Sequence, residues 1–175
     1  MLKKFVRTMA YIGGIATGFY LFASAPGIHK KTKWQHLTGW DYAHRGLYDN
    51  EHGIPENSMA AFRRAVDKGY GIELDVHLTA DNQLVVFHDD TLTRMCGMNK
   101  KISSFLYSDL MQLRLLGTEE GIPLFKDVLE LIDGKVPLII ELKVDGSNQN
   151  LLCPLVWQLL SRYKGDYCIE SFHPF

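Results

Sequence analysis

The sequence has almost no net charge. It contains 19 basic and 20 acidic residues, which gives a formal charge of -1 at pH 7. A domain that binds nucleic acid by neutralising phosphates normally carries a basic excess on one face. The basic residues that cluster here, Lys3, Lys4 and Arg7, lie at the N-terminus and outside the globular part. We therefore expect no nucleic-acid partner.

Cysteine is also scarce. Cys96, Cys153 and Cys168 are odd in number and widely spaced, and no CxxC pair occurs. These features argue against a disulfide framework and against a zinc site built on thiolates. The redox compartment stays open, and the sequence shows neither an internal repeat nor a low-complexity tract.

One long stretch, from Thr8 to Ile28, lacks any charged residue. Its length is roughly the 20 residues that a helix needs to cross a bilayer. We therefore predict an N-terminal transmembrane helix, with residues 1–28 as a membrane anchor, residues 29–39 as a basic linker, and a membrane location for the protein.

A cleaved secretory signal peptide is the alternative, because Ala23-Ser24-Ala25 resembles a small-residue cleavage site. Pro26 would then stand at the new N-terminus, and this disfavours cleavage. Basic residues on both sides of the stretch leave open the side of the membrane on which the rest of the chain lies.

From residue 40 onward, strand-like and helix-like segments alternate, as in chains that form βα units on a parallel sheet. A long, mostly polar excursion at about 89–122 interrupts this pattern. Strands are predicted at about 40–43, 71–77, 83–87, 136–142 and 167–172, and helices from an Asn57 N-cap to about Gly69, at 125–132 and at 149–162.

Three carboxylates form a candidate metal site. Glu73 and Asp75 are two residues apart on a predicted strand, so their side chains share one face, and Glu141 lies at the end of another strand. Apolar neighbours make the first strand a buried one, where an ionised carboxylate is costly unless it is paired or metal-bound. Oxygen ligands favour Mg²⁺ or Ca²⁺. Pairing with basic neighbours is the alternative.

Two histidines, His44 and His88, each follow an apolar strand. Imidazole titrates near neutral pH, so the pair suits proton transfer during P–O cleavage. Arg45 and Lys143 are candidate phosphate-binding cations, and neutralisation of the acidic cluster is their other possible role. The remaining histidines are predicted to be surface or linker residues, with His173 as a further candidate for the site: His29, His36, His52, His77 and His173.

Six segments together resemble the glycerophosphodiester phosphodiesterase family in their order and spacing. They are His44-Arg45-Gly46, Pro55-Glu56-Asn57-Ser58, Gly71 to Val76, Val86-Phe87-His88-Asp89, Ile122-Pro123-Leu124 and Ile140-Glu141-Leu142-Lys143.

This resemblance implies a TIM-type (β/α) barrel and a metal-dependent enzyme. The enzyme would hydrolyse glycerophosphodiesters to glycerol phosphate and an alcohol at a membrane surface. The resemblance places a divalent cation on Glu73, Asp75 and Glu141, and acid/base work on His44 and His88. It makes Glu56 a substrate contact or an outer support of the site. The excursion at about 89–122 corresponds to the place where this family inserts a small subdomain over the substrate.

The barrel is expected to be incomplete. A full barrel has eight strands and about 250 residues, whereas residues 40–175 supply about five strands, so we expect a truncated copy or fragment. Other interpretations remain open: a catalytically inactive membrane-tethered fragment, a phospholipase of related barrel fold that acts on a lysophospholipid-like substrate, or a homo-oligomer that completes the barrel. The oligomeric state, the released alcohol and the roles of the two histidines stay undetermined.

Overall fold

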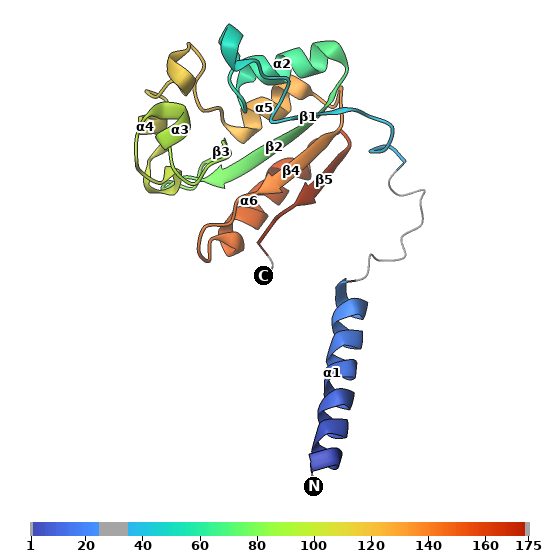
Figure 1. Cartoon of the computed structure of the whole chain (residues 1–175). Coiled ribbons are helices and arrows are strands. Elements are labelled where there is room, and N and C mark those ends of the chain that lie inside the picture. The colour runs from blue at the N-terminus through green and yellow to red at the C-terminus, as the bar shows by residue number, and fades with distance from the viewer. Residues whose placement is uncertain (1, 25–34, 174–175) are drawn as a thin grey trace. The chain divides into compact units, whose positions relative to one another are not determined.

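The computed structural model describes residues 2–24 and 35–173. The chain divides into two compact units, Met1–Trp34 and Gln35–Phe175. The first unit contains helix α1, Leu2–Ser24 (Figure 1). Residues 25–28 of the predicted anchor and residues 29–34 of the predicted linker lie outside the described residues.

A helix is therefore present where an N-terminal helix was predicted, but its predicted transmembrane character is not supported. Among the described residues, no helix combines the length and apolar character needed to cross a membrane. The helix begins at Leu2 and so includes Lys3, Lys4 and Arg7, and its central part contains three glycines, which contribute little hydrophobicity.

The second unit is a five-stranded sheet with helices. Its strands run in the order β1-β2-β4-β5, all parallel, and β3 pairs with β2 at the side. Its elements in chain order are β1 (Tyr42–His44), η2 (Asn50–His52), α2 (Met59–Lys68), β2 (Gly71–Leu78), β3 (Leu84–Val86), α3 (Thr93–Cys96), η3 (Ile102–Ser104), α4 (Tyr107–Leu110), η4 (Leu115–Gly117), α5 (Phe125–Ile132), β4 (Leu138–Leu142), α6 (Gln149–Leu160) and β5 (Tyr167–Glu170).

The third strand differs from the prediction, because β3 runs antiparallel to β2. Only a short turn separates the two strands, in which Asn82 has a φ of 61° and Thr79 bonds to Gln83. A parallel pair needs a crossover of a dozen or more residues, so this connection can form only a hairpin. The sheet therefore holds four parallel barrel strands and one antiparallel strand, instead of five barrel strands.

Strand β2 separates the core from the site. Its residues are all buried, and alternate side chains point to opposite faces. Ile72, Leu74 and Val76 join one apolar cluster with buried residues of α2, α5 and α6. Figure 1 shows α2 and α5 on the same side of the sheet. The helices therefore cover one face, and the polar residues of β2 belong to the other.

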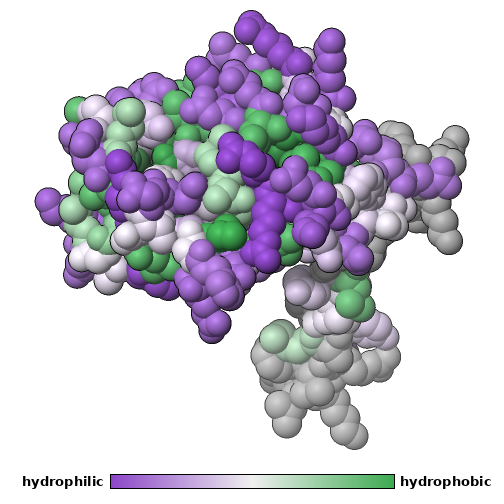
Figure 2. Space-filling view, turned by 90° about the horizontal axis from the view of Figure 1, so that it is seen from above, coloured by the Kyte–Doolittle hydropathy of each residue, from purple (hydrophilic) through white to green (hydrophobic). Residues whose placement is uncertain are grey.

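The excursion at 89–122 has an apolar cluster of its own. Short helices and turns contribute Leu92, Met95, Ile102 and Leu110, which pack with Phe87 after β3. The excursion therefore packs around a small core of its own, and its correspondence to the subdomain that the family inserts stays a prediction. Over the Gln35–Phe175 unit, the face in Figure 2 shows many hydrophilic side chains with smaller hydrophobic patches between them.

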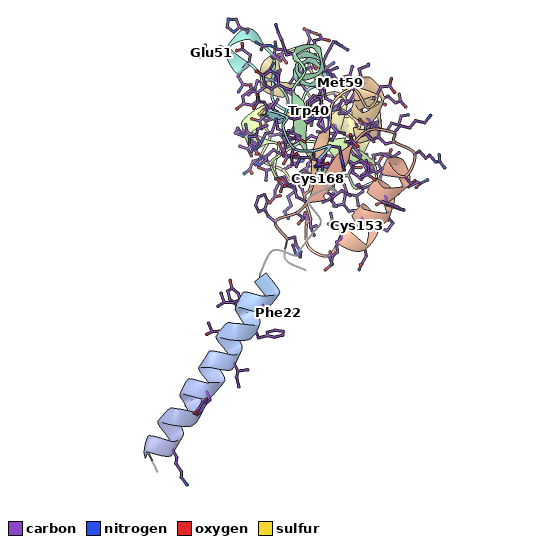
Figure 3. The ribbon with its side chains drawn as sticks, turned by 90° about the vertical axis from the view of Figure 1, so that its right-hand side faces the viewer. Phe22, Trp40, Glu51, Met59, Cys153 and Cys168 are labelled. Carbon is purple, nitrogen blue, oxygen red and sulfur yellow. The ribbon has the colours of Figure 1, made fainter. Side chains whose placement is uncertain are left out.

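One edge of the sheet is open within the described residues. Strand β5 pairs with β4 alone, and Ile169 on it is 44% exposed. Cys168 also lies on β5, and Cys153 lies on α6 (Figure 3). No disulfide links the three cysteines, which are all free.

Candidate active site

Strand register brings the candidate residues together. His44, the last residue of β1, is the register partner of Glu73 on β2. Asp75, two residues further along β2, is the partner of Glu141 on β4. Register partners on parallel strands project to the same face, so these four side chains meet at the C-terminal ends of the strands, the edge that carries active sites in barrels of this kind.

The three predicted metal ligands form a compact buried cluster. Ligand oxygens of Glu73, Asp75 and Glu141 all lie within 4.8 Å of one another. Asp75 is fully buried, and the two glutamates are 7% and 6% exposed. Three converging carboxylates, all acting as oxygen donors, match the preference of a hard divalent cation.

Unpaired polar atoms also fit a missing ligand. Among the described residues, Asp75 Oδ1, Arg45 Nε and Asn57 Oδ1 are buried without a hydrogen-bond partner. The Lys143 ammonium lies 3.0 Å from Asp75 Oδ1, but its orientation does not suit a hydrogen bond to this atom. Buried polar groups are rarely left unpaired, so this cluster fits a site that receives a cation and a polar substrate.

The carboxylates differ in how readily they ionise. Burial and the charge of Asp75 raise the pKa of Glu73 to about 7. Burial also raises the pKa of Glu141. For Asp75, burial acts in the same direction, but hydrogen bonding from Asn57 and the neighbouring Lys143 ammonium outweigh it and lower the pKa. Asp75 therefore ionises more readily than the two glutamates, and Glu73 is partly protonated near pH 7 without metal.

We predict that divalent metal binding displaces a proton from Glu73. Its folded-state pKa of about 7 lies above the ordinary pKa of a glutamate, 4.5, so metal affinity rises as pH increases through about 7. Without metal, the folded state binds more protons than the unfolded state between these two pKa values, so this group contributes less stability as pH rises across that window. Calorimetric titration in two buffers of different ionisation enthalpy measures the released proton.

The matched controls are Glu73→Gln, which should abolish this proton release, and Glu119→Gln, which changes an exposed acid and should leave it unaltered. A wild-type affinity that stays flat between pH 5.5 and 8, within roughly the range over which such a group titrates, would contradict the prediction.

Both predicted cations lie against the acidic cluster. The Lys143 Nζ is 2.8 Å from Glu141 Oε1, and its pKa is raised because the nearby carboxylates of Glu141 and Asp75 outweigh the opposing effect of burial. The Arg45 guanidinium donates to Glu56 Oε1 at 2.9 Å and places Nε 3.7 Å from Asp75 Oδ2. Neutralisation of the cluster, the alternative role considered for these residues, is therefore present in this state.

The backbone after β1 turns sharply to build the site. Arg45 has a φ of 60° and Gly46 a φ of 77°, both in the left-handed region that costs a non-glycine residue about 1–2 kcal/mol. This turn directs the Arg45 backbone N–H to Glu73 Oε2 at 2.9 Å. A Cβ on Gly46 would lie 2.9 Å from the Cβ of Ala61 on α2. Glycine is therefore required for both conformation and space.

We predict that Gly46→Ala destabilises the fold more than Gly97→Ala. Both glycines have φ near 70–77°, but a Cβ on Gly97 meets nothing within 4 Å. Gly97→Ala should cost about 1–2 kcal/mol from backbone strain alone, and Gly46→Ala should add about 1–3 kcal/mol from overpacking. Urea unfolding of the two variants measures this difference. Equal losses would show that close packing against α2 is unimportant.

The two candidate catalytic histidines reach the site from different directions. His44 is exposed, and its Nε2 lies 3.7 Å from Glu73 Oε2. His88 comes two residues after β3, which runs antiparallel to β2. The chain therefore approaches the site in the direction opposite to that of β1. The His88 Nδ1 lies 2.7 Å from Asp89 Oδ1.

Two residues have roles that differ from the prediction. Asn57 was predicted to cap α2, but the cap is Ser58, whose side chain accepts from Ala61 N. Asn57 instead has a φ of 53° and donates from Nδ2 to Asp75 Oδ2 at 2.8 Å. His77, predicted to be a surface or linker residue, is buried, and its Nε2 lies 3.2 Å from the His88 carbonyl oxygen.

The other histidines mostly match the prediction. His36 and His52 are exposed, and His29 lies outside the described residues. His173, the further candidate for the site, lines a cavity of about 250 Å³ together with Asp90, Glu141 and Lys143. Glu56 is buried, and Arg45 and Arg94 both bond to it. The sequence had assigned no role to Arg94 or Asp89.

Comparison with known proteins resolves the family. The Glycerophosphoryl diester phosphodiesterase family profile matches residues 44–162, most of the chain. This chain belongs to that family. The glycerophosphoryl diester phosphodiesterase match includes the predicted catalytic, phosphate-binding and metal-binding residues, from His44 to Lys143, but not the further candidate His173.

Individual relatives agree. The chain is 32% identical over 172 residues to lysophospholipase D GDPD1 of Rattus norvegicus, covering 91% of this chain and 52% of that protein. It resembles a phosphodiesterase structure from Oleispira antarctica, in complex with the product sn-glycerol-3-phosphate, with a TM-score of 0.71, 26% identity and coverage of 79% of this chain and 59% of the other.

A glycerophosphodiester phosphodiesterase structure from Parabacteroides distasonis gives a TM-score of 0.66 at 33% identity, covering 77% of this chain and 57% of the other. The fold is therefore α/β with a parallel sheet that matches the barrels of the family. The chain spans about half the length of the curated relatives it matches.

Proposed function

We propose that this protein hydrolyses glycerophosphodiesters to glycerol phosphate and an alcohol. The observation that carries the proposal is the buried set of Glu73, Asp75 and Glu141, whose ligand oxygens lie within 4.8 Å of one another beside two histidines and two cations. Membership of the family and the product named in the Oleispira antarctica structure support the substrate class.

In this proposal, the side chains divide the work. A divalent cation on the three carboxylates, with Mg²⁺ and Ca²⁺ as the candidates, would supply Lewis-acid polarisation of a phosphoryl oxygen. Arg45 and Lys143 would hold the other phosphoryl oxygens, Arg45 through its planar fork and Lys143 as a point charge. Substrate binding would then replace part of their present pairing with the acids.

Proton transfer would fall to the histidines. One of His44 and His88 would take the proton from the attacking water or neighbouring hydroxyl as its oxygen bonds to phosphorus. The other would deliver a proton to the oxygen of the leaving alcohol as the bond between that oxygen and phosphorus breaks. His88 has a partner suited to this work, since the Asp89 carboxylate at 2.7 Å accepts from Nδ1 and leaves Nε2 for the substrate.

A lysophospholipid-like substrate at a membrane surface is the second candidate. A relative named lysophospholipase D favours it, and α1 exposes aromatic side chains, among them Phe19 and Phe22 at 72% and 82% exposure. Figure 3 shows the Phe22 side chain pointing outward from the helix. Flotation of the full chain with phosphatidylcholine vesicles tests membrane association, and protein left entirely in the unbound fraction would remove it.

The activity test uses the full 175-residue chain. Release of glycerol 3-phosphate from glycerophosphocholine is measured with Mg²⁺, Ca²⁺ or chelator, and choline release from lysophosphatidylcholine is measured in parallel. Metal-dependent turnover of the first substrate supports the proposal, and turnover of the second alone favours the lysophospholipid alternative. A folded sample that binds metal but turns over neither substrate would identify an inactive fragment.

A further inference from the structure

Arg94 joins two loops of the active site. It lies on α3 in the excursion and makes two bidentate pairs. Its Nε and Nη2 donate to Asp89 Oδ2 and Oδ1 at 2.8 and 2.9 Å, and its Nη1 and Nη2 donate to Glu56 Oε2 and Oε1 at 2.8 and 2.7 Å. One guanidinium thus binds the loop after β3 and the loop after β1.

On one side, the contact leads to His88. Asp89 Oδ1 lies 2.7 Å from His88 Nδ1, so a carboxylate held in place selects the tautomer with the proton on Nδ1. Hydrogen bonding from Arg94 is the main reason that the pKa of Asp89 falls to about 2. Asp89 is therefore ionised across the physiological range and accepts a hydrogen bond in this geometry.

On the other side, the contact leads to Arg45. Glu56 Oε1 accepts from Arg94 Nη2 and from Arg45 Nη1, at 2.7 and 2.9 Å. Glu56 is 5% exposed, so it needs cationic partners to stay ionised. Arg94 supplies a second partner. Arg45 can therefore turn toward a phosphate while the buried Glu56 carboxylate stays paired with Arg94.

We propose that Arg94 is a positioning residue that couples the excursion to the chemistry, since it orients His88 through Asp89 and supports Arg45 through Glu56. The role rests on the proposed function, because it assigns catalytic work to His88 and phosphate binding to Arg45. A lysine would not replace Arg94, because one ammonium cannot form two planar bidentate pairs.

The first test measures turnover of glycerophosphocholine by the full chain. Arg94→Met is expected to lower kcat by about 10- to 100-fold, the scale of a misplaced catalytic group, and to raise KM through Arg45. Arg94→Lys should recover only part of this loss. Arg114→Met is the matched control, because Arg114 lies in the same excursion and donates to the backbone carbonyls of Met111 and Leu113.

A double-mutant cycle locates the effect. If Arg94 acts on His88 through Asp89, adding Arg94→Met to Asp89→Asn should lower kcat much less than Arg94→Met does alone in the wild-type background. Additive losses in kcat would show that Arg94 does not act through Asp89, and would overturn that half of the proposal.

The second test is independent of turnover. In histidine-¹⁵N-labelled full chain, two-dimensional NMR reports the His88 tautomer, and the His88→Gln spectrum assigns its signals. The wild type and Arg114→Met should show the Nδ1-protonated form, and Arg94→Met should show a mixture of tautomers. An unchanged tautomer in folded Arg94→Met overturns the positioning role, whether or not the wild type turns over, whereas an inactive wild type with the expected tautomer shift overturns the proposed function alone.

Discussion

Asp75→Asn should abolish divalent-metal binding and reduce phosphodiesterase activity by at least about 100-fold. Asp75 is fully buried at the centre of the cluster, and its oxygens face Lys143, Arg45 and Asn57. An amide has one oxygen instead of two and carries no charge. It can therefore neither hold the cation nor neutralise the Lys143 ammonium. The partly buried Lys143 ammonium would then be paired by Glu141 alone.

Calorimetric metal titration and glycerol 3-phosphate release measure the two effects. Asp67→Asn is the matched control, because it makes the same chemical change at an exposed position on α2. Wild-type metal affinity in folded Asp75→Asn would show that the carboxylate cluster is a structural ion-pair network and that the metal-dependent mechanism is wrong.

His44→Ala and His88→Ala should each lower kcat by about 10²- to 10⁴-fold, the usual contribution of general acid–base catalysis. The losses should occur with little change in metal affinity, because neither imidazole belongs to the carboxylate cluster. His36→Ala is the control, since His36 is exposed and precedes the sheet. Retention of wild-type kcat by either variant would remove that histidine from the mechanism.

The same pair of variants separates acid from base. A p-nitrophenyl phosphodiester releases a weakly basic phenolate that needs no proton, so it should restore much of the kcat of the variant that lacks the general acid. It should not restore the variant that lacks the general base. Equal recovery in both variants would contradict separate roles for His44 and His88.

Residue pattern alone predicted that three carboxylates would lie close together, as they do. Glu73 and Asp75 share a face because side chains alternate along any strand, and their apolar neighbours identify that strand as buried. Glu141 follows from a second apolar strand that ends in the same way. The same alternation could have found His77, which is two residues beyond Asp75 and therefore faces the site, contrary to its prediction as a surface or linker residue.

Structural features that depend on backbone conformation were harder to predict from the sequence. An Asn-Ser pair before a helix is compatible with an N-cap at either residue. Asn57 has a left-handed backbone (φ 53°), and Ser58 is the N-cap of α2. The direction of β3 likewise depended on a short turn that permits only a hairpin. The uncharged stretch after Arg7 predicted a helix at the N-terminus, but within residues 2–24 and 35–173 no helix is long and apolar enough to span a bilayer.

Local chemistry in the sequence therefore determined which residues are candidates to bind a cation, move a proton or contact a phosphate, because residue type and spacing depend on the chain within a few positions. Only the tertiary structure decided how these groups are paired. The partners of Arg94, Glu56 and Asp89, are separated by the whole of α2, β2 and β3, and their convergence on one guanidinium depends on how the excursion packs over the strand ends. Such long-range contacts result from the packing of whole elements, which no local pattern encodes.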